Sequence, residues 1–250
     1  MRESVRARPL FVAGTPQRSG TTALANYLNL HPEILICIER YKYAPRRITP
    51  DLFTFERILD YREGETNIPR ERHVELLERK DPSKLKWIGD KRPAHVKRMK
   101  RLSLDNPGAR FIVIHRSVEE VGESFQARAR NPKDDWPHDF AEGIRRWNLA
   151  LKRAREFVES GSDLPVLILP YHDFFHGDGV CVPLLSRFLE VEFDEGVREE
   201  WNKMSLDFEK RRRPKEPLTG EQRSLIRENK DHENEKWMSD LIERQYAGIR

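Results

Sequence analysis

A glycine-containing segment near the start of the chain has the residue types and spacing of a phosphate-binding loop. It follows an apolar run, precedes a helical pattern, and reads Gly14-Thr-Pro-Gln-Arg18-Ser19-Gly20-Thr21-Thr22. A loop that leads into a helix offers unpaired backbone N–H groups and the positive end of the helix dipole. Ser19, Thr21 and Thr22 would add hydroxyl donors, and Arg18 a cation with forked donors. The alternative is an ordinary strand-to-helix turn capped by Ser or Thr, but this cluster exceeds what a cap requires.

The segment differs from the loop of nucleoside-triphosphate-binding proteins. That loop has four residues between its glycines, followed by Lys and then Ser or Thr. Here five residues separate Gly14 from Gly20, and Thr21 stands where the lysine would be. The segment is therefore not a standard triphosphate-binding loop.

A second group of candidate anion-binding residues follows the apolar run 110–115. Arg116 comes directly after this run, and Ser124 and Arg128 lie four residues apart in a helical pattern that starts at Val118. Residues at this spacing share one helix face, and ligands of open α/β sheets bind at the carboxyl ends of the strands. The three side chains would therefore converge on a second anion; the alternative is a solvated helix face.

Both segments resemble those of sulfotransferases that use 3′-phosphoadenosine 5′-phosphosulfate (PAPS) as sulfuryl donor. In that family the 5′-phosphosulfate loop reads P-[RK]-S-G-T-T, and Arg18 to Thr22 match it from the basic residue onward. The start of the loop differs from the family pattern, since members usually have one residue fewer between the first glycine and the arginine. The family's 3′-phosphate site uses an Arg and a Ser eight residues later, the spacing of Arg116 and Ser124. Some members add an arginine four residues beyond, where Arg128 lies.

Three weaker matches follow in the order that the family has. They are Gly89-Asp90-Lys91-Arg92-Pro93, similar to G-[DE]-K-x-P; Arg146-Trp147-Asn148, similar to a common W-N helix; and Leu169 to Phe174, similar to V-x-Y-E-D-L. The resemblance implies that Lys91 approaches the sulfuryl group and that Tyr171 reaches the 3′-phosphate. The resemblance spans residues 8–195. We expect one domain over 8–250, in which residues 196–250 would close the site. Residues 1–7 would form a short tail.

The resemblance implies transfer of the sulfuryl group of PAPS to an acceptor hydroxyl or amine, which leaves 3′-phosphoadenosine 5′-phosphate (PAP). Negative charge develops on the departing phosphate oxygen, and Arg18, Lys91 and the helix start at 20–22 would stabilise it. A sulfuryl group carries less charge than a phosphoryl group, so we expect no metal requirement. The sequence also has no CxxC or His/Cys metal spacing.

An acceptor hydroxyl also needs a general base. Glu39 directly follows the apolar run 34–38, and sulfotransferases acting on protein tyrosine or sugars often carry a glutamate after this strand. In the tyrosylprotein type an arginine lies two residues further, but this chain has Tyr41 there, so peptide-tyrosine specificity is not implied. A surface role for Glu39 and a base role for His115 are the alternatives.

A parallel sheet would bring these residues together. Short apolar runs predict buried strands, and longer helical patterns lie between them. The expected strands are 10–13, 34–38, 87–88, 110–115 and 166–169, and the expected helices are 22–30, 70–80, 94–104, 118–130 and 140–160. This alternation indicates an α/β fold, a single domain with a central parallel sheet of about five strands flanked by helices. From about residue 180 we expect charged helices and a loop at 209–215, in which the basic residues 210–213 would contact the cofactor.

Composition argues against several function classes. The 250 residues include 46 Lys and Arg against 42 Asp and Glu, and the net charge of +4 is too small to indicate nucleic-acid binding. Cys37 and Cys181 cannot form a disulfide framework and are expected to be small core residues. No apolar run approaches the roughly 20 residues that span a bilayer, and no signal-peptide segment precedes the first strand. We expect a cytoplasmic protein without nucleic-acid or membrane partners.

Two other function classes stay open. A P-loop kinase-like phosphotransferase would share the fold but depend on magnesium. A non-enzymatic nucleotide- or RNA-binding module would spread basic residues and aromatics over one face. For a sulfotransferase we expect a small-molecule or sugar acceptor, bound by the loop-like segments 40–65 and 131–139, with Tyr41, Tyr43, Phe53, Phe55, Trp136 and His138.

Overall fold

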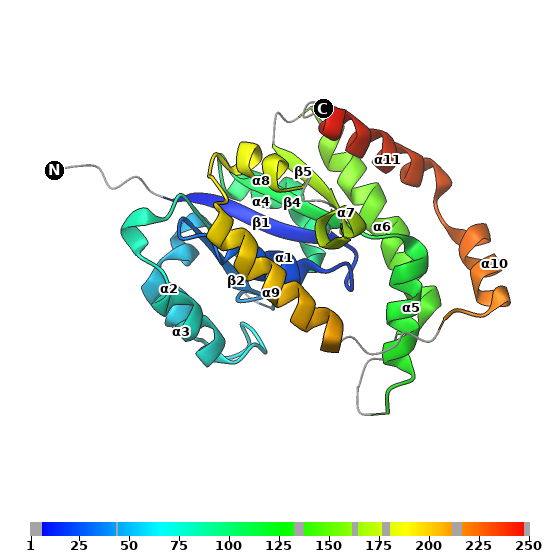
Figure 1. Ribbon diagram of the computed structural model, residues 1–250, viewed down its shortest axis with the longest axis horizontal. Coiled ribbons are helices and arrows are strands. Elements are labelled where there is room, and N and C mark those ends of the chain that lie inside the picture. The colour runs from blue at the N-terminus through cyan, green and yellow to red at the C-terminus, as the bar shows by residue number, and fades with distance from the viewer. Residues whose placement is uncertain are drawn as a thin grey trace.

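Five parallel strands form the central sheet of the protein (Figure 1). They are β1 (Arg8–Thr15), β2 (Ile34–Ile38), β3 (Trp87–Lys91), β4 (Arg110–His115) and β5 (Val166–Pro170). Their order is β2-β3-β1-β4-β5, and every neighbouring pair is parallel. The strands that the apolar runs predict are all present, and the predicted fold class is confirmed.

The computed structural model describes residues 7–43, 45–132, 138–161, 165–176, 181–211 and 217–247. Helices connect the strands and follow the last of them. The α-helices are α1 (Thr21–Leu28), α2 (Phe55–Leu59), α3 (Arg70–Glu78), α4 (Met99–Asp105), α5 (Val118–Ala129), α6 (Phe140–Val158), α7 (Tyr171–His176), α8 (Cys181–Leu189), α9 (Glu195–Arg211), α10 (Gly220–Asn229) and α11 (His232–Ala247). The 3-10 helices are η1 (Pro50–Phe53), η2 (Pro82–Lys84) and η3 (Pro93–Arg98).

The direction in which the chain adds strands reverses at β1. From β1 the chain builds β2 and β3 on one side of it, and then crosses to place β4 and β5 on the other side. In open α/β sheets such a reversal leaves a crevice outside the carboxyl ends of the strands, where ligands bind. The loop after β1 lies at this crevice.

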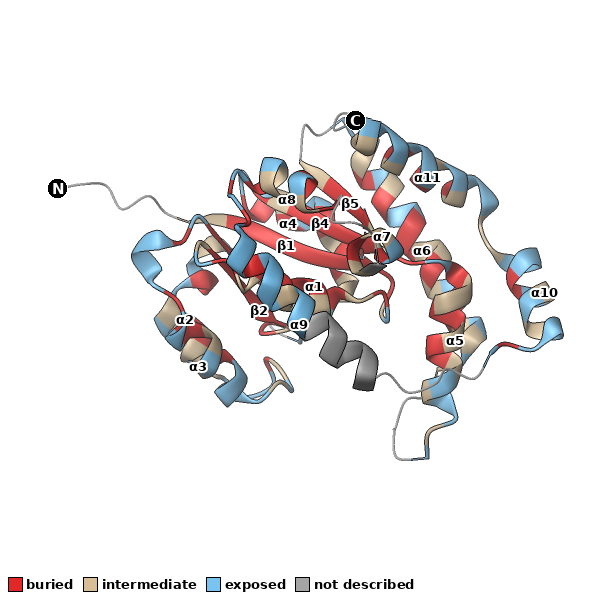
Figure 2. Cartoon of the chain, viewed as in Figure 1, coloured by how far each residue is buried: buried red, intermediate tan, exposed pale blue. Residues whose placement is uncertain are grey.

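Side chains of the strands alternate between two hydrophobic layers, one on each face of the sheet. Figure 2 shows the strands in the colour of buried residues along most of their length. In β1, Phe11 packs with Trp147 of α6 in one layer, and Leu10 packs with Leu24 of α1 in the other. Because both faces are covered, the strands read as continuous apolar runs in the sequence. The layers hold the carboxyl ends of all five strands in one rigid edge.

The last two helices extend the first of these layers. α10 packs against α5 and α6, and α11 packs against α6 and β5. Cys37 and Cys181 are buried free thiols, as expected. None of the helices in the described part of the chain has the length and apolar character needed to cross a membrane.

Three expectations about local structure need correction. The helix expected over 94–104 begins as the 3-10 helix η3, which has Pro93 at its first position, and becomes α-helical only from Met99. The segment 40–65 is not a continuous loop, since it contains η1 and α2. The loop expected from residue 209 begins later, since α9 continues through residue 211, and 212–216 lie outside the described residues.

Gly89 of β3 supports a sharp test of the strand packing. A Cβ at this position would lie 1.7 Å from the carbonyl oxygen of Leu10 in β1, so Gly89→Ala forces the two strands apart. We expect this variant to lose more than about 4 kcal/mol of stability in urea unfolding. Gly220→Ala is the matched control, because a Cβ there meets nothing within 4 Å, and it should change stability by less than about 0.5 kcal/mol. An unchanged urea midpoint for Gly89→Ala would contradict the packing described here.

Candidate functional site

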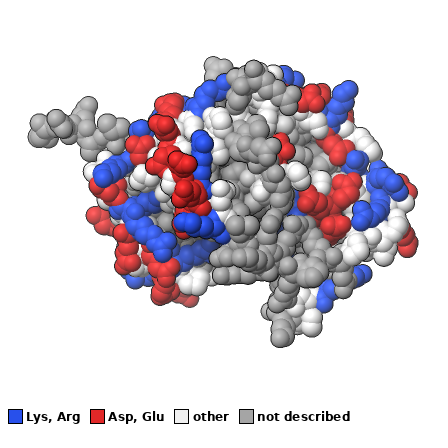
Figure 3. All heavy atoms as spheres, viewed as in Figure 1, with Lys and Arg blue, Asp and Glu red and all other residues white. Residues whose placement is uncertain are grey.

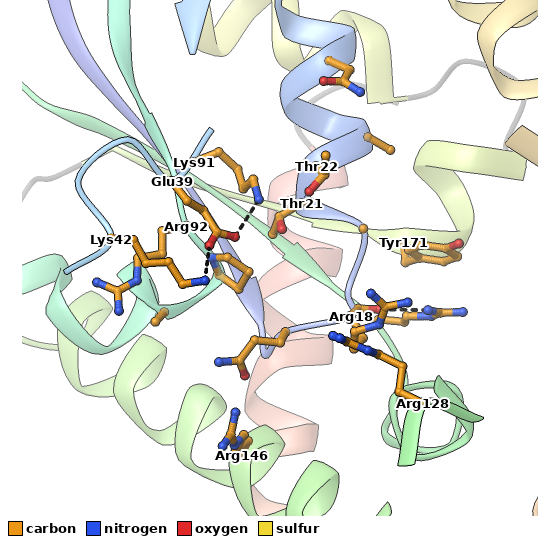
Figure 4. Close-up of a pocket in the computed structure, with 17 residues that line it drawn as sticks. Arg18, Thr21, Thr22, Glu39, Lys42, Lys91, Arg92, Arg128, Arg146 and Tyr171 are labelled. Atoms are coloured by element: carbon orange, nitrogen blue, oxygen red, sulfur yellow. Dashed lines mark hydrogen bonds and ion pairs between the residues drawn. The ribbon is translucent and has the colours of Figure 1, made fainter. Parts of the chain in front are cut away.

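A cavity of about 500 Å³ lies at the carboxyl ends of the strands (Figure 4). Residues at or just beyond the end of each of the five strands contribute to its walls. The lining residues are Gln17, Arg18, Gly20, Thr21, Thr22, Ala23, Asn26, Glu39, Lys42, Lys91, Arg92, Pro93, Ala94, Arg116, Arg128, Arg146 and Tyr171. Of these residues seven are Lys or Arg and one, Glu39, is acidic. The cavity is therefore built for an anion.

The loop after β1 presents the amino end of α1 to this cavity. Gly20 adopts φ 93°, a left-handed conformation that favours glycine, and provides no side chain to cap the helix. The first-turn N–H groups thus have no side-chain cap, and Thr21 and Thr22 line the cavity beside them. Ser19, predicted to bind the same anion, is fully buried and donates its hydroxyl to the carbonyl oxygen of Pro16 at 2.6 Å. Ser19 therefore shapes the loop.

Arg116 is held against the same loop from the end of β4. Its guanidinium donates to the carbonyl oxygen of Arg18 at 2.9 Å and to the Glu120 carboxylate at 3.0 Å. The ring of Tyr171 lies 4.1 Å from the guanidinium carbon, a cation–π contact. Only 5% of the Arg116 side chain is exposed, and its Nε has no hydrogen-bond partner in the part of the chain that the structure describes. An unpartnered buried donor of this kind is a position for an anion oxygen.

Arg18 and Arg128 complete this side of the cavity. Arg18 donates from Nε to the hydroxyl of Ser124 at 3.1 Å, which links the loop to α5. Arg128, one turn further along α5, lines the cavity. Ser124 does not line the cavity but accepts the hydrogen bond of Arg18, which does. Figure 4 places Arg18, Arg128 and Tyr171 on one side of the α1 start and Glu39, Lys42, Lys91 and Arg92 on the other.

The position of Glu39 is set by the end of β2. Its backbone has φ 50°, a left-handed conformation that turns the chain out of the strand. Its N–H donates to the carbonyl oxygen of Lys91 at 2.9 Å, and its own carbonyl oxygen accepts from Thr66 at 2.7 Å. The preceding N–H, of Ile38, donates to Nε2 of His73 at 3.1 Å. These bonds direct the carboxylate into the cavity.

Two lysines flank the Glu39 carboxylate. Lys91 Nζ lies 3.0 Å from one oxygen and Lys42 Nζ lies 3.3 Å from the other. Burial raises the pKa of Glu39, but the charges of Lys91 and then Lys42 outweigh this effect, so its pKa lies below the usual value. The ammonium of Lys91 is 3% exposed, and burial lowers its pKa although Glu39 opposes that shift. Near neutral pH the carboxylate is therefore ionised and beside at least one cation.

Several lining residues were not among the predicted site residues. Lys42 lies in the loop after β2, three residues beyond Glu39, and no strand or helix pattern indicated that it would return to the carboxylate. Arg92 and Arg146 belong to segments with weak family matches. Lys91, next to Arg92, was assigned a role, but no residue of the match around Arg146 was. The sequence did contain a signal for Arg92 and Arg146, since each is a basic residue within or beside a segment that matches the family.

None of the four described aromatic residues expected to bind the acceptor lines this cavity. Tyr41 and Phe53 are buried in the hydrophobic core, and Tyr43 is exposed. Phe55 packs against the same core, and Trp136 lies outside the described residues. The expectation failed because apolar residues in irregular segments often cover a core, as Tyr41 and Phe53 do here.

Neither His115, the alternative base, nor His138, which was expected near the acceptor, lines the cavity. His115 is hydrogen-bonded to the Thr15 hydroxyl at 2.9 Å and packs near Trp147, and burial lowers its pKa to about 4. His138 is 2.7 Å from the Arg146 guanidinium. Among the described residues, no group of three or more His, Cys, Asp or Glu side chains is placed to hold a metal ion.

Comparison with known proteins identifies the family of this site. Residues 9–195 match a family profile described as "Sulfotransferase family". The chain belongs to the sulfotransferase family. A search of curated proteins finds no match to this sulfotransferase-family chain.

Solved structures share the sulfotransferase fold at low sequence identity. The sulfotransferase domain from the curacin biosynthetic pathway covers 89% of this chain and 96% of its own, with 13% identity and a TM-score of 0.54. The sulfotransferase STF9 from Mycobacterium avium covers 86% of this chain and 70% of its own, with 14% identity and a TM-score of 0.52. The sulfotransferase domain of the Synechococcus PCC 7002 olefin synthase covers 77% of this chain and 76% of its own, with 17% identity and a TM-score of 0.52.

The pairing of Glu39 with Lys91 yields a prediction about titration. Lys91→Met removes the cation with the larger effect, while burial continues to raise the pKa of Glu39. We expect the Glu39 pKa to rise in Lys91→Met and to rise less in Lys42→Met, measured from the ¹³C shift of the carboxyl carbon. Glu190, which pairs with Arg8 and Arg110 and has a pKa of about 2, is the internal control and should not change. An unaltered Glu39 titration in Lys91→Met would show that the ion pair does not form in solution.

Proposed function

We propose that this protein transfers the sulfuryl group of PAPS to an acceptor hydroxyl or amine. The observation that carries the proposal is the division of one cavity into two cationic sides around the α1 start. Arg18 and Arg128 lie on one side, together with Arg116, which contacts Arg18 and Tyr171. Lys91 lies with Glu39 on the other side. A donor that carries a 3′-phosphate and a 5′-phosphosulfate needs two such anion sites in one cavity.

The residues on the first side fit a phosphate monoester, which carries about two negative charges. The unpartnered Nε of Arg116 is a donor without an acceptor, and the Tyr171 ring keeps its guanidinium plane in place. Arg128 adds a second charge from α5. Thr21, Thr22 and the N–H groups of the first α1 turn would hold the phosphosulfate group.

The other side supplies a base and a cation for the transfer step. The ionised Glu39 carboxylate accepts the proton of the acceptor hydroxyl as its oxygen forms a bond to sulfur. The bond between sulfur and the bridging oxygen of the donor breaks, and that oxygen becomes part of the 5′-phosphate of PAP. Lys91 and the N–H groups at the start of α1 oppose the negative charge that grows on this oxygen, whereas Arg18 lies on the side that would hold the 3′-phosphate. When Glu39 takes the proton, Lys91 loses its ion-pair partner and becomes available to the departing phosphate.

A kinase-like phosphotransfer is the alternative enzyme class. Magnesium in such sites is usually bound through one or two carboxylates together with substrate phosphates. In the described lining the one carboxylate is Glu39, and it is paired with two lysines. This donor set favours sulfuryl transfer.

The assignment of a 3′-phosphate site yields a prediction about nucleotide binding. The protein should bind PAP at least tenfold more tightly than 5′-AMP in calorimetry, because the second nucleotide lacks the phosphate that Arg116 and Arg128 would bind. A hydrogen bond to a charged group contributes about 1.5–3 kcal/mol, so Arg128→Ala should weaken PAP binding about tenfold and leave AMP binding unchanged. Arg116→Lys keeps the charge but loses the forked donors, and it should also weaken PAP binding. Equal affinities for PAP and AMP in the wild type would remove the 3′-phosphate assignment.

The proposed role of Glu39 as general base yields a prediction about turnover. Glu39→Gln keeps the size of the side chain but cannot take a proton, and general-base catalysis contributes roughly 10²–10⁴ in rate. Turnover should fall by about two orders of magnitude or more, while the protein stays folded and PAP affinity stays near wild type. His115→Gln serves as the comparison, because that ring lies outside the cavity lining. If Glu39→Gln remains active and the folded His115→Gln does not, the base is the histidine.

A further inference from the structure

Basic side chains continue beyond the site cavity along η3 and α6. A second cavity, of about 520 Å³, is lined by residues of η3, α4 and α6. The lining includes Lys97, Arg98, Lys100, Arg101 and Arg153 and one acidic residue, Glu156. Arg92 and Arg146 line the first cavity, and Arg145 is close enough to Lys97 of the second for its charge to act on that residue. We call these eight residues the η3–α6 basic band.

The charges of this band are only partly neutralised within the protein. Arg145 and Arg146 pair with Glu142, Arg101 pairs with Asp105, and Arg153 pairs with Glu156. In the described part of the chain, no ion pair joins a carboxylate to Arg92, Lys97, Arg98 or Lys100. By contrast, acidic and basic side chains lie side by side on the face shown in Figure 3.

The cations of the band also act on one another. Burial lowers the pKa of Lys97, and the nearby charges of Arg146 and Arg145 lower it further. Burial and then Arg92 lower the pKa of Arg98 in the same way. Such mutual repulsion destabilises the folded protein unless an anion binds between the charges.

The band is longer than one small anion. Arg146 lines the first cavity and Arg153 the second. They lie seven residues apart on α6, which corresponds to about 10 Å along the helix axis and to the same helix face. A ligand that meets both must carry anionic groups at a comparable separation.

We propose that the acceptor is a hydroxyl-rich polyanion, an acidic oligosaccharide, that lies along the η3–α6 basic band with one hydroxyl at Glu39. This inference rests on the proposed sulfuryl transfer. Lys42 and Arg92 would bind the acidic group of the sugar unit nearest Glu39, and the second cavity would bind a unit further along the chain. In each turnover the reacting hydroxyl loses its proton to Glu39 and gains the sulfuryl group.

A saccharide fits the band better than a nucleic acid does. Proteins that bind single-stranded nucleic acid stack its bases on accessible aromatic rings. In the described lining of the second cavity the one aromatic residue is Phe157, which is 4% exposed and belongs to the core. The band therefore offers charge without a stacking surface.

The test uses calorimetry on the full chain saturated with PAP. A chondroitin hexasaccharide, which carries carboxylates, should bind at least tenfold more tightly than the same hexasaccharide with its carboxyl groups reduced to alcohols. The double variant Lys97→Glu/Lys100→Glu changes two exposed residues of the band, and should weaken binding of the acidic hexasaccharide at least tenfold without changing PAP affinity. Lys84→Glu, also exposed but in η2 before β3, is the matched control and should bind as wild type does.

The outcomes separate this inference from the proposed function. If PAP binds but the acidic and reduced hexasaccharides bind equally, the polyanion inference is wrong and the sulfotransferase proposal stands. If PAP does not bind, the proposed function itself fails. If a single-stranded RNA of equal charge displaces the acidic hexasaccharide and binds more tightly, the partner is a nucleic acid, and the saccharide assignment is overturned.

Discussion

The ion pair between Glu39 and Lys91 is the constraint on which the site depends. Ile38 of β2 is in register with Lys91 of β3, so parallel pairing of these two strands places Glu39 beside the lysine. Both groups are largely removed from water, with side chains 17% and 3% exposed. A buried charge that loses its partner is costly, and therefore the pair ties the chemistry of the site to the register of the sheet.

The rest of the structure holds the two strand ends against each other. Arg40, fully buried, donates its backbone N–H to Asp90 and its side chain to Glu65. His73 accepts the N–H of Ile38 on the other side of β2. The loop after β1 and the Arg116–Tyr171 stack then close the cavity from the far strands. A carboxylate surrounded by cations stays ionised, as a base must be, and the same cations attract anionic ligands.

Much of this arrangement could be predicted from the sequence, because Glu39 and Arg116 directly follow apolar runs and the family resemblance placed Lys91 and Tyr171 shortly after two others. Parallel strands buried on both faces produce such runs, and their carboxyl ends meet at one edge. Glu39, Lys91, Arg116 and Tyr171 were therefore placed correctly relative to the sheet, although their roles stay predictions. The fold class followed from the same alternation of strands and helices.

The parts that could not be predicted depend on long-range packing. Nothing local indicates that Lys42 folds back on Glu39, or that the hydroxyl of Ser19 bonds within its own loop. Tyr41 and Phe53 were expected to bind the acceptor because they lie in an irregular segment, yet that segment covers the core. The η3–α6 basic band joins residues that are more than 40 positions apart in sequence, and bulk charge hides it because acidic residues elsewhere balance it.

The central claim, sulfuryl transfer through a cation-lined site, is tested most directly by comparing two labelled donors. Wild-type protein and Glu39→Gln are incubated with a mixture of hydroxylated acceptors and either ³⁵S-labelled PAPS or γ-³²P-labelled ATP, with EDTA or with magnesium. The account predicts that wild type transfers ³⁵S equally well in EDTA and in magnesium, that Glu39→Gln transfers far less, and that no ³²P is transferred. Magnesium-dependent transfer of ³²P without transfer of ³⁵S would contradict it.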